Sequence, residues 1–169
     1  GEWRKWYGNF DYVVNFANSG KEIKEEVNRK YPYLRGNTGF YIRYEDQYFK
    51  EGLTWSAVSS GKFAVRLHSK NSIFSNAGFV AIPKANLFYY IALLNSNIAF
   101  NIIGGMSQTL NFNASDISKF PTIVPGDKGT INMVEELANQ CINLCREDWD
   151  AFEVSWNFTQ HPLISNDEE

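Results

Sequence analysis

Residues 51–66 read EGLTWSAVSSGKFAVR, and this stretch decides how the chain around it is expected to fold. Its aromatic and β-branched residues lie on either side of Ser59-Ser60-Gly61, a pattern typical of a strand, a tight turn and a second strand. The stretch also holds hydroxyl side chains, a tryptophan and two cations, which are residue types that contact DNA. An exposed hairpin, with serines that only make turns and a tryptophan in the core, has the same composition, so both interpretations stay open.

Neighbouring segments extend this hairpin into a sheet. Residues 12–16, 40–44 and 79–82 are rich in aromatic and β-branched side chains and are bounded by turn-forming residues. With residues 53–58 and 63–67 they predict a mixed, twisted β-sheet.

Apolar spacing predicts three helices. Residues 21–30 follow the turn Asn18-Ser19-Gly20 and precede Pro32, so a short helix is expected there. From Leu87 to Ile102 apolar residues recur every three or four positions, and the asparagines inside this stretch favour a core helix over a membrane span. A third helix is predicted from a longer apolar stripe, within which Asp148 could cap a second helix. The stripe consists of Val134, Ala138, Cys141, Cys145, Trp149, Phe152 and Trp156.

The predicted fold class is therefore α+β, a mixed twisted sheet with packed helices and a long C-terminal helix. At 169 residues the chain fits one compact unit. We expect residues 1–129 to form the sheet-containing part and residues 130–169 a helical spacer with an acidic tail. The chain begins Gly1-Glu2-Trp3 without a methionine or an apolar leader, and we expect it to be a fragment of a larger protein.

Charge is distributed unevenly along the chain. The net charge is -3, which by itself disfavours nucleic-acid binding. Residues 1–84 hold 13 Lys and Arg against 8 Asp and Glu, a balance of +5, whereas residues 85–169 hold 3 against 11, a balance of -8. A polyanion is therefore expected to meet the first half.

Cysteine and histidine positions indicate structural roles. Cys141 and Cys145 are four residues apart in an expected helix, a poor geometry for a disulfide and too few ligands for zinc. They favour core thiols in a reducing cytoplasm. His68 and His161 have no third residue that would complete a triad or a metal site. No metal site and no catalytic residue are predicted.

Two other functions fit the residues less well. Asp11, Glu22 and Lys24 are the residue types of a nuclease metal site, but Glu22 and Lys24 begin a charged helix instead of lying on a strand. Glycan binding through the aromatic residues, 16% of the chain, is disfavoured because most of these rings fall at core spacing.

Five ordered blocks give the chain a specific resemblance. They are WRKWYGN at 3–9, EGLTWSAVSSGKFAVR at 51–66, LLNSNIA at 93–99, TLNF at 109–112 followed by DISK at 116–119, and EDWDAFEVSW at 147–156. In this order they resemble the C-terminal half of adenine-specific DNA methyltransferases of the phage-growth-limitation (BREX) type. The middle blocks are also similar to target-recognition domains of type I specificity subunits and type IIG restriction-modification enzymes.

The resemblance implies a recognition module without its own catalytic centre. An adenine methyltransferase requires an Asn/Asp-Pro-Pro-aromatic motif to hold a flipped base, but the five prolines here are never adjacent. No glycine-rich nucleotide loop occurs either. S-adenosylmethionine is expected only in the parent enzyme, in a methyltransferase domain N-terminal to this region.

The expected partners are double-stranded DNA, that methyltransferase domain and possible further subunits of the defence system, with no membrane. A protein-docking module without base reading is the alternative. Phosphate contacts are expected from Arg4, Lys5, Lys62 and Arg66. Groove-facing polar groups are expected from Thr54, Ser56, Ser59, Ser60 and Asn111, and Trp55 is expected to stack or pack.

Overall fold

A three-stranded antiparallel sheet lies at the centre of the structure, a computed structural model that describes residues 2–59, 62–75, 77–106 and 111–164. The middle strand β1 (Gly52–Ser56) pairs with β2 (Arg66–His68) on one side and β3 (Gly78–Ala81) on the other. In this register Leu53 lies opposite both Leu67 and Ala81. The N-terminal segment adds a parallel bridge to the outer edge of β2, through Trp6 and Arg66.

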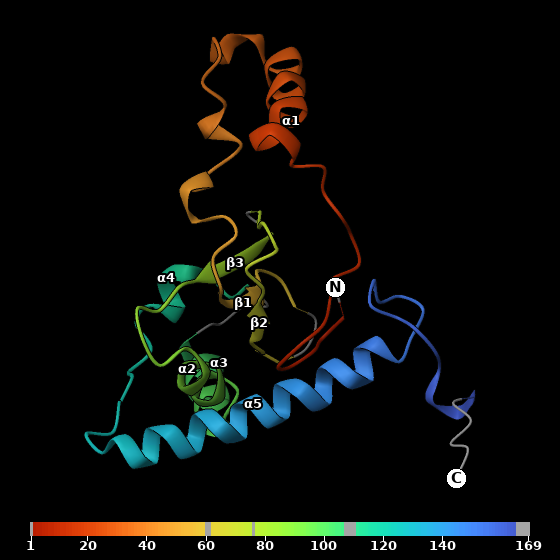
Figure 1. The fold of residues 1–169 in the computed structure, drawn as a ribbon. Coiled ribbons are helices and arrows are strands. Elements are labelled where there is room, and N and C mark those ends of the chain that lie inside the picture. The colour runs from red at the N-terminus through yellow and green to blue at the C-terminus, as the bar shows by residue number, and fades with distance from the viewer. Residues whose placement is uncertain (1, 60–61, 76, 107–110, 165–169) are drawn as a thin grey trace.

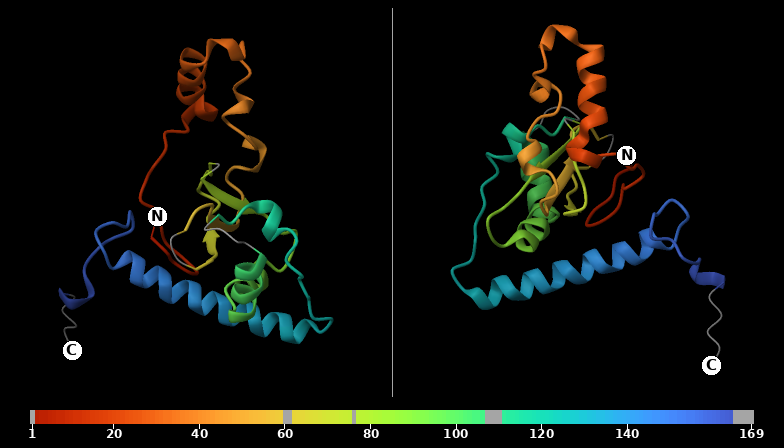
Figure 2. Two further views of the ribbon diagram at one scale, coloured as in Figure 1. Left: turned by 180° about the vertical axis from the view of Figure 1, so that it is seen from behind. Right: turned by 45° about the horizontal axis from the view of Figure 1, so that its top comes forward.

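The helices lie above, beside and below the sheet in the view of Figure 1. Those in the described residues are α1 (Ala17–Lys30), α2 (Leu87–Leu94), α3 (Asn97–Met106), α4 (Ala114–Ile117) and α5 (Lys128–Asp150). Short 3-10 turns lie at Pro32–Leu34, Thr38–Phe40, Glu45–Gln47 and Pro162–Ile164. Figure 2 shows that α1 and the first three turns form a lobe that projects from the sheet, while α5 runs along the far side of the body. This confirms the predicted α+β class with its long C-terminal helix.

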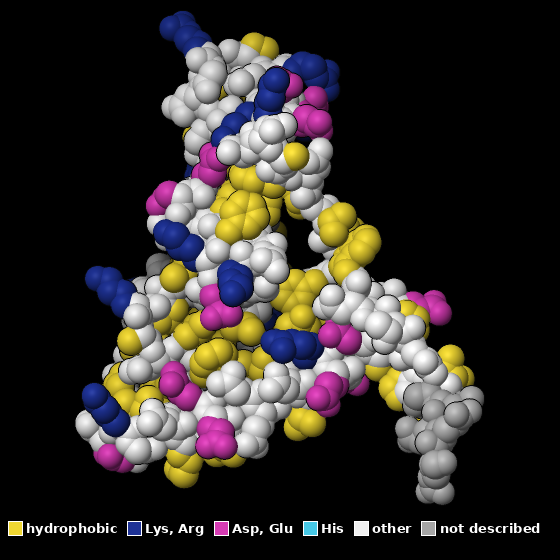
Figure 3. Space-filling model, in the orientation of Figure 1, with side chains coloured by type: hydrophobic (Ala, Val, Ile, Leu, Met, Phe, Trp, Pro, Cys, Tyr) yellow, Lys and Arg dark blue, Asp and Glu magenta, His cyan; other side chains and the backbone are white. Residues whose placement is uncertain are grey.

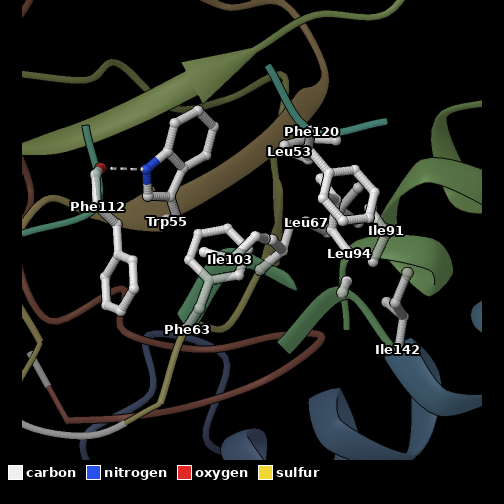
Figure 4. Close-up of a cluster of buried hydrophobic side chains, with 12 residues drawn as sticks. Leu53, Trp55, Phe63, Leu67, Ile91, Leu94, Ile103, Phe112, Phe120 and Ile142 are labelled. Carbon is white, nitrogen blue, oxygen red and sulfur yellow. Dashed lines mark hydrogen bonds between the residues drawn. The ribbon is translucent and has the colours of Figure 1, made fainter. Parts of the chain in front are cut away.

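The hydrophobic core joins the sheet to α2, α3 and α5. The sheet contributes alternate residues of β1, Leu53 and Trp55, because successive side chains of a strand point to opposite faces. The helices contribute fully buried side chains, among them Ile91, Ile103 and Ile142 (Figure 4). Helix α5 thus packs onto the body through α2.

Two predicted strands are wrong. Residues 12–16 form no strand and are exposed apart from the half-buried Phe16, and residues 40–44 form turns around Thr38–Phe40 and Glu45–Gln47. The residue types favour strands, but a strand is stable only where a neighbouring strand accepts its backbone hydrogen bonds, and these segments have no such pairing among the described residues. Strands β1, β2 and β3 confirm the other predicted positions to within a few residues.

The helix predicted from Leu87 to Ile102 is two helices bent by 68°. Asn95 and Ser96 lie between them, and the Ser96 Oγ caps the start of α3 by accepting a hydrogen bond from the Ala99 N–H at 3.1 Å. No single helix in the described residues is long and apolar enough to cross a membrane, and only α2 and α3 taken together reach that length and composition.

Helix α5 begins at a strong N-terminal cap. The Asp127 carboxylate accepts hydrogen bonds from the Gly129 and Thr130 N–H groups at 3.1 and 2.8 Å. These bonds and one from the Thr130 hydroxyl lower the pKa of Asp127. The helix ends at Asp150, so Asp148 does not begin a second helix and the predicted stripe stops at Trp149.

Candidate DNA interface

Four of the predicted DNA-contacting residues line one shallow depression at the end of β1. The depression encloses about 10 Å³, room for about one water molecule, so it is too small to hold a base. It therefore offers a surface against which a partner could lie. Its lining residues are Ser56, Ser59, Lys62 and Arg66, with Glu2, Trp3, Phe63, Ala64 and Phe112.

The alternation of the sheet brings these side chains together. Leu53 and Trp55 face the core, so Thr54 and Ser56 lie on the opposite face of β1. Arg66 is paired with Thr54 across the β1–β2 ladder and therefore lies on that same face. Its guanidinium donates hydrogen bonds to the Ser56 hydroxyl at 3.2 Å and to the Arg4 carbonyl at 3.4 Å.

Arg66, one of the predicted phosphate contacts, is buried. Only 7% of the residue is exposed, and this burial lowers the pKa of its guanidinium. Its hydrogen bonds hold Ser56 and the N-terminal segment in place, so Arg66 stabilises the lining of the depression. Lys62 is the only exposed residue of the four cations predicted to meet phosphate, and its Nζ lies 5.0 Å from the centre of the Phe100 ring.

Arg4 and Lys5 also have structural partners. The Arg4 guanidinium lies over the Trp149 ring, and its Nη1 is 3.4 Å from the Asp148 carboxylate. Lys5 Nζ donates a hydrogen bond of 2.8 Å to the Asn95 carbonyl at the end of α2. Both side chains are half-buried and attach the N-terminal segment to the helices, and the phosphate contacts expected from them stay a prediction.

Trp55 packs instead of stacking on a base. Only 3% of the residue is exposed, and its indole Nε1 donates a hydrogen bond of 2.9 Å to the Phe112 carbonyl (Figure 4). A ring without an exposed face cannot stack on a nucleotide, so of the two roles expected for Trp55 the structure shows packing. Thr54 is half-buried, and its hydroxyl donates to the Phe79 carbonyl of β3 at 2.8 Å.

The remaining predicted contacts lie beside the depression or outside the described residues. Asn111 is exposed and forms an antiparallel bridge with Val58, which brings it next to Ser59. Ser60 lies outside the described residues. Trp3 was not predicted as a contact, yet it lines the depression with 47% of its surface exposed. Its place in WRKWYGN, the first of the blocks that carry the resemblance, is the sequence signal that could have found it.

A larger groove of about 490 Å³ lies between the end of β3, α2 and α4. It is lined mainly by apolar side chains and shares only Trp55 with the predicted contacts. The lining includes Leu53, Trp55, Ile82, Pro83, Tyr90 and Ile117.

Titratable groups outside the depression are scattered through the described part of the chain. Cys141 and Cys145 are free thiols on α5, and burial raises the pKa of Cys145. His68 is buried at the end of β2, and burial lowers its pKa. No three His, Cys, Asp or Glu side chains come together within the described ranges to hold a metal ion.

The sequence of the chain is similar to segments of two adenine-specific methyltransferases. It is 33% identical over 169 residues to the adenine-specific methyltransferase PglX of Lacticaseibacillus casei (strain Zhang) and 32% identical over 170 residues to the adenine-specific methyltransferase BrxX of Escherichia coli O9:H4 (strain HS). Each match covers 98% of this chain but only 13% of the relative. No family model matches the chain. The predicted resemblance to BREX-type adenine methyltransferases is confirmed.

Proposed function

We propose that this chain, as a homologue of a segment of the BREX-type adenine methyltransferases, recognises double-stranded DNA for a larger phage-defence enzyme. The observation that carries the proposal is the depression in which Ser56 and Ser59 lie beside exposed Lys62 and Trp3. A hydroxyl group donates to phosphate oxygens and can donate to or accept from base edges, and an ammonium group binds phosphate. A shallow surface of this kind suits a groove or backbone better than a flipped base.

Sequence reading and methyl transfer are separate in this proposal. The chain has no Asn/Asp-Pro-Pro-aromatic motif and corresponds to 13% of the length of each relative. S-adenosylmethionine and the target adenine would therefore bind in a methyltransferase domain elsewhere in the parent polypeptide, N-terminal to this module. The module would position that domain by binding a defined sequence beside the adenine.

The experiment is duplex binding as a function of salt, measured by fluorescence anisotropy with the 169-residue chain and a labelled duplex of about 30 base pairs. Lys62→Ala is expected to weaken binding and to lower the slope of log K against log salt by about one, the loss of one phosphate contact. Lys128→Ala removes an equivalent exposed lysine at the start of α5 and is expected to change neither quantity. Equal slopes for the parent and Lys62→Ala would refute the interface.

Docking to another protein is the second candidate function, and the outer face of α5 favours it. Met133, Leu137 and Leu144 lie on this helix with more than half of each residue exposed. Exposed apolar side chains at helical spacing are typical of a surface that packs against a partner. Charged replacements there, such as Leu137→Glu, are expected to leave duplex binding intact and to disrupt assembly with the catalytic domain or other defence subunits.

A further inference from the structure

Residues 30–44 form the far end of the projecting lobe, and their composition differs from that of the rest of the chain (Figure 1). They read KYPYLRGNTGFYIRY, with three cations, five aromatic residues and no carboxylate. Figure 3 shows Lys and Arg side chains standing out at this end of the lobe. The segment therefore combines positive charge and aromatic rings at a surface distant from α5.

Four of these rings form one continuous platform. Tyr31 and Tyr41 are stacked, with ring centres 4.1 Å apart and planes inclined by 10°. Tyr33 meets Tyr31 edge-on at 6.0 Å, and Phe40 meets Tyr41 edge-on at 5.3 Å. The Tyr33 and Tyr41 hydroxyls are 3.2 Å apart and hydrogen-bonded. These contacts define the aromatic platform as Tyr31, Tyr33, Phe40 and Tyr41.

The platform is not part of the hydrophobic core. In the described residues the buried cluster, with the side chains packed against it, includes none of residues 11–50. Tyr33 is 68% exposed and Phe40 is 56% exposed. Aromatic side chains normally bury their large apolar surface, so exposed rings held in a fixed array are typical of a binding surface.

Cations flank the platform at both ends. Lys30 Nζ lies 5.5 Å from the centre of the Tyr31 ring, and the Arg43 guanidinium lies 5.2 Å from the centre of the Phe40 ring. Arg35 is exposed at the left-handed turn between them. None of the three forms an ion pair within the described residues.

Three of the five carboxylates between residues 17 and 47 pair with cations outside residues 30–44, while Glu22 and Asp46 accept hydrogen bonds from the Asn15 and Gln47 side-chain amides. Ion pairs join Lys21 to Glu25, Lys24 to Glu45 and Arg29 to Glu26. The positive charge of residues 30–44 is therefore left to attract an anion from solution.

We propose that the aromatic platform binds single-stranded or locally unpaired DNA. A base can stack on an aromatic ring of the protein only if the face of the base is free, and in an intact duplex the base faces are covered by neighbouring bases. Lys30, Arg35 and Arg43 would bind the phosphates of the same single strand. Alternating rings and cations suit the alternating bases and phosphates of a strand. The platform shares no residue with the depression at the end of β1, so this activity goes beyond the proposed duplex recognition and does not depend on it.

The test is binding of the 169-residue chain to a fluorescein-labelled thymidine oligonucleotide of about twelve nucleotides. Tyr33→Ala and Phe40→Ala are each expected to weaken this binding about five- to a hundredfold, the loss of one stacked base. Tyr33→Phe keeps the ring and is expected to bind like the parent. Tyr12→Ala is the matched control, because Tyr12 is exposed and lies outside the platform.

Charge is tested separately. The triple replacement Lys30→Ala, Arg35→Ala and Arg43→Ala is expected to lower the single-strand salt slope by about two, since each phosphate contact contributes about 0.7. The control replaces three other exposed lysines by alanine and is expected to leave the slope unchanged; they are Lys70, Lys119 and Lys128.

Two outcomes would overturn the platform: no single-strand binding by the parent, or unchanged binding in both ring variants. In the second case, a loss of binding in the cation variant would indicate a general polyanion surface. Duplex binding of Lys62→Ala is measured in parallel. If Lys62→Ala loses duplex binding while the ring variants keep single-strand binding, the platform is refuted and the proposed duplex interface is supported. The reverse pattern would refute the duplex interface alone.

Discussion

Replacing Asn95 by alanine tests how the corner between α2 and α3 holds the segment that lines the depression at the end of β1. The Asn95 side chain closes on one backbone unit: its Oδ1 accepts from the Val65 N–H at 3.0 Å, and its Nδ2 donates to the Val65 carbonyl at 2.9 Å. Both residues are buried, and Val65 lies between Lys62 and Arg66 in the segment that forms the depression. The amide therefore fixes the position of that segment against α2.

The cost of Asn95→Ala follows from what remains unpaired. The Val65 carbonyl keeps the Trp6 N–H as a donor at 2.9 Å, but the buried Val65 N–H loses its acceptor. An unsatisfied buried donor costs about 1–3 kcal/mol, and the second lost hydrogen bond adds about 1 kcal/mol. With about 2–4 °C per kcal/mol for a chain of this size, the melting temperature should fall by roughly 10 °C.

Thermal unfolding followed by circular dichroism measures this fall. Asn101→Ala is the matched control, because Asn101 is exposed on α3 and alanine is a better helix former. The control is expected to melt at or slightly above the temperature of the parent. A melting temperature for Asn95→Ala within about 2 °C of the parent would show that the amide does not hold the segment.

Three further replacements test other parts of the fold. Trp55→Phe leaves the Phe112 carbonyl without its indole donor and is expected to cost about 1–3 kcal/mol of unfolding free energy, read from urea denaturation, without changing the salt slope of duplex binding. Gly52→Ala places a Cβ 2.5 Å from the Ala81 carbonyl oxygen and should lower the free energy of unfolding by about 1–3 kcal/mol. Gly104→Ala is the control, because it has open space in a helix and should raise the free energy of unfolding by about 1 kcal/mol. Equal melting temperatures of the two variants would contradict the close packing of β1 on β3. Asp127→Ala removes the cap of α5, and the parent is expected to be more stable than this variant. Because folding lowers the pKa of Asp127, this difference in unfolding free energy should be full above roughly pH 4 and should shrink as the pH falls through the lowered pKa. A difference that grows in acid would contradict this.

Local sequence signals predicted the elements whose packing follows from their own pattern. The alternation of β1 places Leu53 and Trp55 in the core, as expected. Of the predicted stripe on α5, Ala138 and Trp149 are buried, but Val134, Cys141 and Cys145 are half-buried, and the α5 residue in the core cluster is Ile142, which the stripe omitted. Residues 12–16 and 40–44 have equally strong strand composition but lack a pairing partner among the described residues, and composition carries no information about the partner. The break between α2 and α3 at Asn95 could not be predicted from local sequence either, because the hydrogen-bonding partner of Asn95, Val65, lies 30 residues away in the chain.

Residue type predicted the site only in part. Ser56, Ser59 and Lys62 line one depression, and the alternation of β1 predicts the face on which Ser56 lies. Arg66 has the chemistry of a phosphate contact, but its position opposite Thr54 in the ladder buries it. A basic residue on a strand is therefore a poor predictor of contact until the register of that strand is known.

Selection from a pool of random duplexes tests the central claim most directly. The 169-residue chain, and in parallel its Lys62→Ala and Ser59→Ala variants, would be used to enrich bound duplexes over successive rounds. The proposed function predicts that the parent chain enriches one defined motif and that at least one variant loses or relaxes that preference. Binding that enriches no motif, or a motif unchanged in both variants, would contradict sequence recognition by this surface.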